Sequence, residues 1–265
     1  MWLEMEKTHN NQDNSLLLET VMLEGEIMLQ SGAEVYRVED TMRRILDCFG
    51  FDPDYMLVIT TGIVLSLHDE NNSPVTMVKR IHQRSANISR ICGVNTVSRE
   101  LCSGTIDLSE ANKRLKEIKC EKHYNKFVHS VGIVGVAAFF VVMFGGTGID
   151  FAGGLAVGSI YAAADYLLSK TRFNDFIITS LNASIIAITA FLLSAFVLHG
   201  SNPDTMIMGA IMPLVPGVPF ATAIRDMLNG DYSSGSARIM EAVVIALAVA
   251  TGVGCGIILA ELFIP

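Results

Sequence analysis

Residues 126–145 read KFVHSVGIVGVAAFFVVMFG, and this stretch decides the class of the protein. After its first lysine it is almost wholly apolar, and a run of about 18 such residues is long enough to cross the hydrocarbon core of a bilayer as a helix. Comparable apolar runs fill the rest of the chain. We therefore expect a polytopic α-helical membrane protein with about five transmembrane helices, near residues 127–145, 151–169, 176–198, 204–224 and 238–262.

Charged residues are distributed unevenly along the 265-residue chain. Residues 1–126 hold 15 of the 19 lysines and arginines and 19 of the 27 acidic residues. This split predicts a polar domain over 1–126 and a transmembrane domain over 127–265, with the lipid bilayer as an obligatory partner. The net charge of −8 argues against nucleic acid as a partner, because nucleic-acid binding needs a basic surface.

Basic residues in the connecting segments predict the orientation. The segments after the first and third helices carry no lysine or arginine, whereas those after the second and fourth carry Lys170, Arg172, Arg225 and Arg238. Basic connecting segments favour the cytoplasmic side of a membrane. We therefore expect a multi-pass protein of the cytoplasmic (inner) membrane of a bacterium, with its N-terminus inside and its C-terminus outside.

The polar region 1–126 has the pattern of a cytoplasmic α+β domain. Helices are expected at 16–30 and 33–49, near 94–103 and near 108–125. Gly50 is a natural stop for the second helix. The β-branched segment 55–67 predicts a strand or a bent strand pair, and 75–81 predicts the returning strand after a turn at 68–74. The letters SGAE at 31–34 match a capping box, which would place Ser31 at the start of the second helix.

No standard catalytic motif, such as a P-loop, HExxH or GxSxG, is present in the sequence. The cysteines form neither a CxxC pair nor metal-ligand spacing with histidine, and they fit free thiols in a reducing cytosol: Cys48, Cys92, Cys102, Cys120 and Cys255. We therefore expect no enzymatic activity, no cofactor and no metal site.

Polar residues within the apolar runs are few and therefore informative. Asp165 lies about two-thirds along the second expected helix, where a carboxylate is costly and normally faces a polar cavity or a partner. It becomes an ordinary interfacial residue if that helix ends near Tyr166. Asn182 and Ser184 lie in the third expected helix, where they serve either a solute pathway or hydrogen bonding between helices.

The fourth apolar run contains Pro213, Pro216 and Pro219, immediately before the pair Arg225 and Asp226. Proline interrupts a helix, and in a bilayer a broken helix survives only where its freed backbone groups line a cavity or are buried in protein. A kinked structural helix is one reading. The other is a discontinuous helix beside a pathway, including Gly217, with an arginine able to meet an anionic solute.

Two stretches resemble the signatures of the threonine/serine exporter family. They are SGAEVYRVEDTMRRILDCFGF at 31–51 and PLVPGVPFATAIRDMLNGDYSSGSARIMEA at 213–242. The resemblance covers nearly the whole chain and implies a membrane exporter of small polar metabolites with a cytoplasmic N-terminal domain. The positions that match the signatures are Ser31, Gly32, Glu34, Arg37, Glu39, Pro213, Pro216, Gly217, Arg225 and Asp226.

The expected number of helices is similar to that of the split form of this family. There, the resemblance implies, a larger YjjP-like subunit exports succinate together with a small YjjB-like membrane subunit, whereas long members export threonine and serine. Small-residue faces at Gly154 and Gly158, and at Gly252 and Gly256, suit close helix contacts with such a subunit or with another copy of the chain. The alternative function is a membrane-anchored enzyme or sensor whose polar domain carries the activity.

Overall fold

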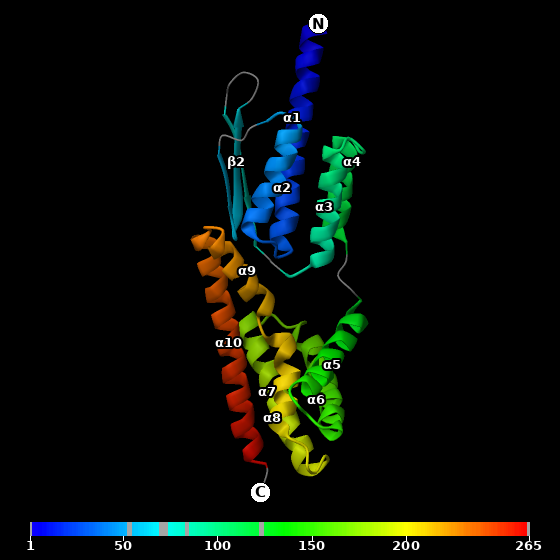
Figure 1. The fold of residues 1–265 in the computed structure, drawn as a ribbon, viewed down its shortest axis with the longest axis vertical. Coiled ribbons are helices and arrows are strands. Elements are labelled where there is room, and N and C mark those ends of the chain that lie inside the picture. Colours follow the sequence, from blue (N-terminus) through cyan, green and yellow to red (C-terminus); the bar gives the residue numbers. More distant parts are fainter. Residues whose placement is uncertain (1, 52–54, 69–73, 83–84, 122–124, 264–265) are drawn as a thin grey trace. The chain divides into compact units, whose positions relative to one another are not determined.

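The computed structural model describes residues 2–51, 55–68, 74–82, 85–121 and 125–263 (Figure 1). Contacts between residues divide the chain into two compact units. Unit 1 comprises Met1–Lys122 together with Val218–Ile239, and unit 2 comprises His123–Gly217 together with Met240–Pro265. A segment from the second half of the sequence therefore belongs to the same unit as the polar N-terminal region.

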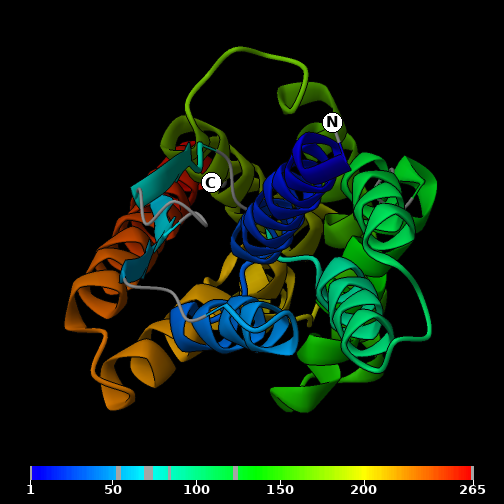
Figure 2. The same cartoon turned by 90° about the horizontal axis from the view of Figure 1, so that it is seen from above.

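Helix α1 (Trp2–Gln30) is the centre of unit 1. It contacts the three other helices of the N-terminal region and two strands of the sheet, and Figure 2 shows it with the sheet on one side and α4 (Leu108–Cys120) on the other. Its buried side chains include Val21, Ile27 and Leu29. The helix begins well before the expected residue 16. This earlier start could not be predicted, because the first half of the helix is polar and has no apolar periodicity.

The second helix, α2 (Val35–Cys48), has the expected amphipathic pattern. Its buried residues recur every three or four positions: Val35, Val38, Met42, Ile45 and Leu46. The helix ends at the expected stop, because Gly50 has a φ of 76°, which side-chain-bearing residues rarely adopt.

The expected capping box before α2 is wrong. Glu34 is the N-cap residue, its backbone is extended, and its side chain makes no capping hydrogen bond. The helix therefore begins later than position 33. Because the Glu34 carboxylate is engaged by arginine side chains, it does not fold back onto the helix start.

A three-stranded antiparallel sheet follows α2, in the order β1–β2–β3. Strands β1 (Tyr55–Ile59) and β2 (Gly62–His68) form the bent pair expected over 55–67, with Ile59 opposite Gly62. Strand β3 (Pro74–Arg80) returns along β2, as expected. The turn predicted at 68–74 lies largely outside the described residues. Alternate side chains of β2, including Ile63, Leu65 and Leu67, are buried in the core that α1 and α2 share.

Helices α3 (Ile88–Cys102) and α4 form a pair against α1. The start of α3 lies before the expected residue 94, because the Asn87 side chain accepts a hydrogen bond from Arg90 N and caps the helix there. Helix α4 ends at Cys120, earlier than expected. The Arg90 side chain meets this end, where it donates to the carbonyls of Lys119 and Glu121 at 3.1 and 2.6 Å.

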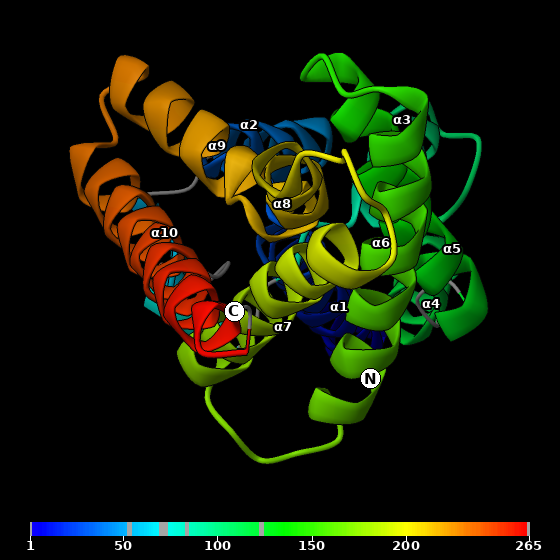
Figure 3. The same cartoon turned by 90° about the horizontal axis from the view of Figure 1, so that it is seen from below.

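Unit 2 consists of apolar helices. In the described part of the chain, four helices are long and apolar enough to cross a membrane: α5 (Lys126–Met143), α6 (Gly148–Leu168), α7 (Asp175–Phe196) and α10 (Tyr232–Glu261). Helix α6 packs against α5, α7 and α8 (Pro203–Ile211), and Figure 3 shows it between α5 and α7. These four helices match expected runs, although α10 begins before residue 238.

The fourth expected run is broken, as its prolines predict. Helix α8 passes into the short 3-10 helix η1 (Met212–Leu214), and α9 (Gly217–Leu228) begins after Pro216. Taken together as one broken span, this pair would make a fifth candidate. The described residues therefore contain four or five candidate transmembrane helices.

The small-residue faces are used inside the chain. A Cβ added at Gly154 or Gly158 would come within 2.9 Å of side chains on α5, so these glycines allow α5 and α6 to approach closely. In the same way, Gly252 and Gly256 lie directly against the backbone carbonyls of Ser180 and Ser184 on α7. These faces are consequently not left open for a partner subunit.

Candidate functional site

The two signature stretches meet in unit 1. The Arg225 side chain, on α9, donates from Nη1 to Glu34 Oε1 at 2.8 Å. The neighbouring Asp226 accepts a hydrogen bond on Oδ1 from the backbone N–H of Val35, the first residue of α2, at 2.9 Å. In sequence these partners lie 191 residues apart. The Asp226 carboxylate thus satisfies one of the amides that are left unpaired at the start of α2, a position where negative charge is favourable.

Arg238 completes this cluster from the first part of α10. Its Nε lies 3.1 Å from Asp226 Oδ2, and the two side chains are 5% and 0% exposed. Its remaining nitrogens donate to the backbone carbonyl of Ala33 at 2.7 Å and to Thr222 Oγ1 at 3.0 Å. A buried charge is tolerated only when it is paired and hydrogen-bonded, as Arg238 is. The cluster of Glu34, Arg225, Asp226 and Arg238 therefore ties α2, α9 and α10 together.

The other N-terminal signature residues surround this cluster without joining a single pocket. Gly32 has a φ of 82° in the turn before α2, which explains the need for glycine there. The Arg37 Nε lies 3.7 Å from Glu34 Oε2, and Ser31 is buried beside the same turn. Glu39 points to the sheet instead, where it accepts a hydrogen bond from Val58 N at 3.1 Å, and burial raises the pKa of its carboxyl.

A second polar site lies in unit 2, between α6 and α7. The Asn182 side chain donates from Nδ2 to Asp165 Oδ1 at 3.1 Å. Asn182 is only 1% exposed, and its Oδ1 receives no hydrogen bond from the described residues. The buried Tyr161 lies one helical turn before Asp165. A carboxylate and a partly satisfied amide are thus held together on two predominantly apolar helices.

Ser184 does not join this pair by a hydrogen bond. Its hydroxyl donates to the backbone carbonyl of Gly252 on α10 at 2.7 Å. This contact secures the close approach of α7 and α10. Of the three polar residues expected in the second and third helices, the structure joins Asp165 with Asn182 and places Ser184 at a helix contact.

The expected pathway residues therefore divide between the two units. Pro213 lies in η1, Pro216 precedes α9, and Gly217 is the first residue of α9, and all three belong to the first of the two segments of unit 2. Arg225 and Asp226 belong to unit 1 and contact the N-terminal signature. Sequence order alone had grouped all five with the membrane helices.

Arg238 and Asp150 are among the buried charged residues that sequence reasoning missed. Arg238 had been assigned to a connecting segment, because a single arginine at the edge of an apolar run carries no signal of its distant partners. Asp150 is 3% exposed at the start of α6, where it forms a capping box with Thr147 and accepts a hydrogen bond from Asn202 N at 2.6 Å. The letters TGID at 147–150 carry the signal for that box.

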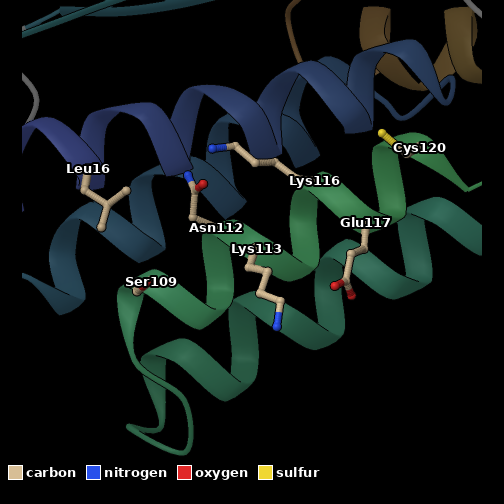
Figure 4. Close-up of a pocket in the computed structure, with 7 residues that line it drawn as sticks. All are labelled: Leu16, Ser109, Asn112, Lys113, Lys116, Glu117 and Cys120. Atoms are coloured by element: carbon tan, nitrogen blue, oxygen red, sulfur yellow. The ribbon is translucent and has the colours of Figure 1, made fainter.

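A groove of ≈ 570 Å³ lies between α1 and α4 in unit 1 (Figure 4). Two of its polar side chains are engaged by α1. The Asn112 side chain, turned towards α1 in Figure 4, donates to Thr20 Oγ1 at 2.9 Å, and Lys116 pairs with Glu19 at 2.9 Å. These contacts hold the two helices together, so the groove is a consequence of helix packing rather than a converging set of reactive groups.

A family model described as "Putative threonine/serine exporter" matches residues 19–260 of this chain. The match includes both signature stretches and every helix of unit 2. No solved structure matches the chain.

Curated relatives are similar at low identity. The "Probable threonine/serine exporter" of Mycobacterium tuberculosis is 22% identical over 86% of this chain and 43% of its own length. The "Threonine/serine exporter" of Corynebacterium glutamicum is 23% identical over 90% of this chain and 50% of its own length. The chain thus spans about half the length of these relatives. The "Probable succinate transporter subunit YjjP" of Escherichia coli is 25% identical over 86% of this chain and 89% of its own length.

Proposed function

This chain belongs to the threonine/serine exporter family, and from that premise we propose that it is one subunit of a secondary exporter of small carboxylate-bearing metabolites. The family is one of transporters, and the apolar helices make the chain a multi-pass protein of the inner membrane. Its substrate is a dicarboxylate such as succinate, or threonine and serine, the compounds in the names of the relatives. Unit 1 faces the cytoplasm and the C-terminus lies outside, in accordance with the positions of the basic residues.

The observation that carries this proposal is the pair of Asp165 and Asn182. Ionisable residues within membrane helices are costly and are retained mainly where they serve a solute or ion pathway. Here the carboxylate has one amide partner at 3.1 Å, and the amide oxygen has an unused acceptor position. A site that is purely structural would be expected to satisfy its buried polar atoms. The pair therefore has the capacity to exchange its internal hydrogen bond for one to a transported solute or coupling ion.

The break between η1 and α9 supplies a second element of the pathway. Pro213, Pro216 and Pro219 remove backbone donors from this segment, and a new helix begins at Gly217. The first amides of a helix have no partners within it and carry a partial positive charge. Transporters use such half-helix ends to hold the carboxylate of a solute. Gly217 N already donates to the Val215 carbonyl and Pro219 has no N–H, so the amides of Val218 and Phe220 have this role in the proposed mechanism.

Arg225 is the residue of the charged cluster that remains able to meet an anionic solute. Its side chain is 64% exposed although one nitrogen is bound to Glu34, whereas Arg238 is buried. A guanidinium presents several donors in a fixed plane, so it can bind a second carboxylate beside the first. Glu34 and a solute carboxylate would then share Arg225 during entry from the cytoplasm.

A second, small YjjB-like membrane subunit completes the exporter in this proposal. Support comes from the word "subunit" in the name of the Escherichia coli relative, which covers a chain of nearly the same extent. The small-residue faces give no support, because α5 with α6 and α7 with α10 already occupy them. Self-association of this chain is the weaker alternative.

Efflux from proteoliposomes tests the proposed function. The chain would be reconstituted with and without a small YjjB-like subunit, and the vesicles loaded in turn with labelled succinate, threonine and serine. We expect efflux of one of these compounds above that of protein-free vesicles, and faster efflux with both subunits. No efflux of any of them, together with turnover of a metabolite by the purified chain, would favour the membrane-anchored enzyme instead.

A further inference from the structure

An apolar groove of ≈ 610 Å³ runs between α5 and α6, within unit 2. Most of its lining side chains are aliphatic or small: Val131, Val134, Gly135, Leu155, Ala162 and Ala163. The hydroxyl of Ser159, which also lines it, donates to the Leu155 carbonyl at 2.7 Å within the same helix. The groove therefore offers an apolar surface on two helices that are each long enough to cross a membrane.

One end of this groove is aromatic and positively charged. Phe127 and Tyr166 line that end, because α5 begins where its antiparallel neighbour α6 finishes. The ammonium groups of Lys126 and Lys170 lie 5.0 and 4.1 Å from the centroid of the same Tyr166 ring. Among the described residues, no carboxylate forms an ion pair with either lysine. Two like charges are thus gathered around one ring without a negative partner from the protein.

We propose that this groove is a binding site for an anionic phospholipid of the surrounding bilayer. The phosphate lies between Lys126 and Lys170, and an acyl chain occupies the groove from Tyr166 towards Gly135. Basic pockets at the ends of membrane helices bind anionic head groups, and lysines near a membrane surface each contribute about fivefold to such binding. A tyrosine at the boundary suits an apolar contact on one side and a polar head group on the other.

The charge at one end favours a lipid over a helix of a partner protein as the occupant. A transmembrane helix would need to place an acidic residue at the level of Lys126 and Lys170. An anionic phospholipid supplies both required features in one molecule, a negative head and an apolar chain. The groove is unobstructed beside Gly135, where an added Cβ would meet no atom within 4 Å.

Lipid retention by the purified full-length chain tests this site. The protein would be extracted into nanodiscs that contain equal amounts of phosphatidylglycerol and phosphatidylcholine, and its bound lipids measured by native mass spectrometry. We expect retention of phosphatidylglycerol over phosphatidylcholine by about tenfold or more. The double variant Lys126→Gln/Lys170→Gln should lose this preference, and Gly135→Leu should reduce retention of both lipids by filling the groove.

Gly132→Leu is the matched control for the filled groove. Gly132 is on the same helix and also has open space around its missing Cβ, but it does not line the groove. It should retain lipid as the wild type does. Equal retention of the two lipids by the wild type would overturn the proposal. So would unchanged retention of both lipids by Gly135→Leu combined with loss of co-purification of a second membrane subunit, which would identify a protein helix as the occupant.

Discussion

The two units use polar residues in opposite ways. In unit 1, Arg238 and Asp226 are buried as a charged pair, and each has further hydrogen bonds to the chain. In unit 2, Asp165 has one amide partner, and the buried Asn182 oxygen has no donor among the described residues. The first arrangement fixes a structure, because each of its two buried charges faces an opposite charge of the protein at 3.1 Å. The second leaves capacity for a ligand, which is the difference expected between a scaffold and a transport site.

The largest expected effect is on folding, from removal of the buried cation of unit 1. The variant Arg238→Met would leave Asp226 buried without its charge partner, which typically costs about 3–5 kcal/mol. We expect little folded protein, measured as yield and thermal stability of the purified full-length chain. Arg172→Met, which changes an exposed arginine, should behave as the wild type does. A stable, monodisperse Arg238→Met protein would remove the scaffold role of the cluster.

The next effect concerns transport without loss of fold. Pro216→Ala permits a more continuous helix between η1 and α9, and a continuous helix would not present free amides to a solute. We expect retained expression and efflux reduced by at least about tenfold, equivalent to about 1.4 kcal/mol in the rate-limiting barrier. Pro219→Ala is the control, because Pro219 lies in the first turn of α9, where proline is tolerated. Wild-type efflux by Pro216→Ala would show that the break has no role.

The accuracy with which each unit could be predicted depends on how far apart its interacting residues lie along the sequence. The apolar runs, the amphipathic α2 and the alternation in β2 are local patterns, so the helices and the hairpin could be predicted. The proline-induced break could be predicted for the same reason. The pairing of Arg225 with Glu34 could not, because its partners are 191 residues apart and no local period connects them.

The capping box was predicted wrongly for the same reason, because a partner distant in the sequence overrides a local pattern. Ser31 and Glu34 have the spacing of a local cap, yet a distant arginine competes for the Glu34 carboxylate and the helix starts one residue after it. In unit 2, the presence of Asp165 in an apolar helix could be recognised as unusual. Its contact with Asn182 depends on how α6 packs against α7, which sequence spacing does not determine.

A smaller effect is expected from Glu24, an acidic residue of unit 1 that forms no ion pair with the described residues. Glu24 is fully buried, and burial raises the pKa of its carboxyl well above the usual value, although the nearby Ser98 hydroxyl opposes the change. A raised pKa in the folded state means that stability falls as the pH rises above the unfolded-state pKa of about 4.3. Glu24→Gln should therefore raise the unfolding free energy at pH 7 by on the order of 1–3 kcal/mol.

Thermal denaturation of the purified chain between pH 5 and pH 8 measures this effect. The wild type should lose stability across the range more steeply than Glu24→Gln. Glu19→Gln, on the same helix but 52% exposed and paired with Lys116, is the control and should retain the steeper slope of the wild type. Parallel curves for the wild type and Glu24→Gln would contradict the buried, protonated carboxyl.

The smallest effect is expected at Glu34, whose partner Arg225 is largely exposed. After Glu34→Ala, water can solvate Arg225, so the loss should be about 1 kcal/mol or less. Denaturation curves of the full-length chain at neutral pH give this value. Glu34→Gln, which keeps a hydrogen-bond acceptor, should lose less. A loss as large as that of Arg238→Met would mean that the exposed part of the cluster carries its stability.

Asp165→Asn, assayed for both efflux and thermal stability in parallel with Asp175→Asn, tests whether the pair of Asp165 and Asn182 takes part in transport. Asp175→Asn is the control, because it makes the same substitution at the exposed start of α7, outside the pair of Asp165 and Asn182. We expect Asp165→Asn to insert and melt as the wild type does, within about 1 kcal/mol, while its efflux falls at least about tenfold and Asp175→Asn remains active. Wild-type efflux from a correctly inserted Asp165→Asn protein would show that the pair has no part in transport.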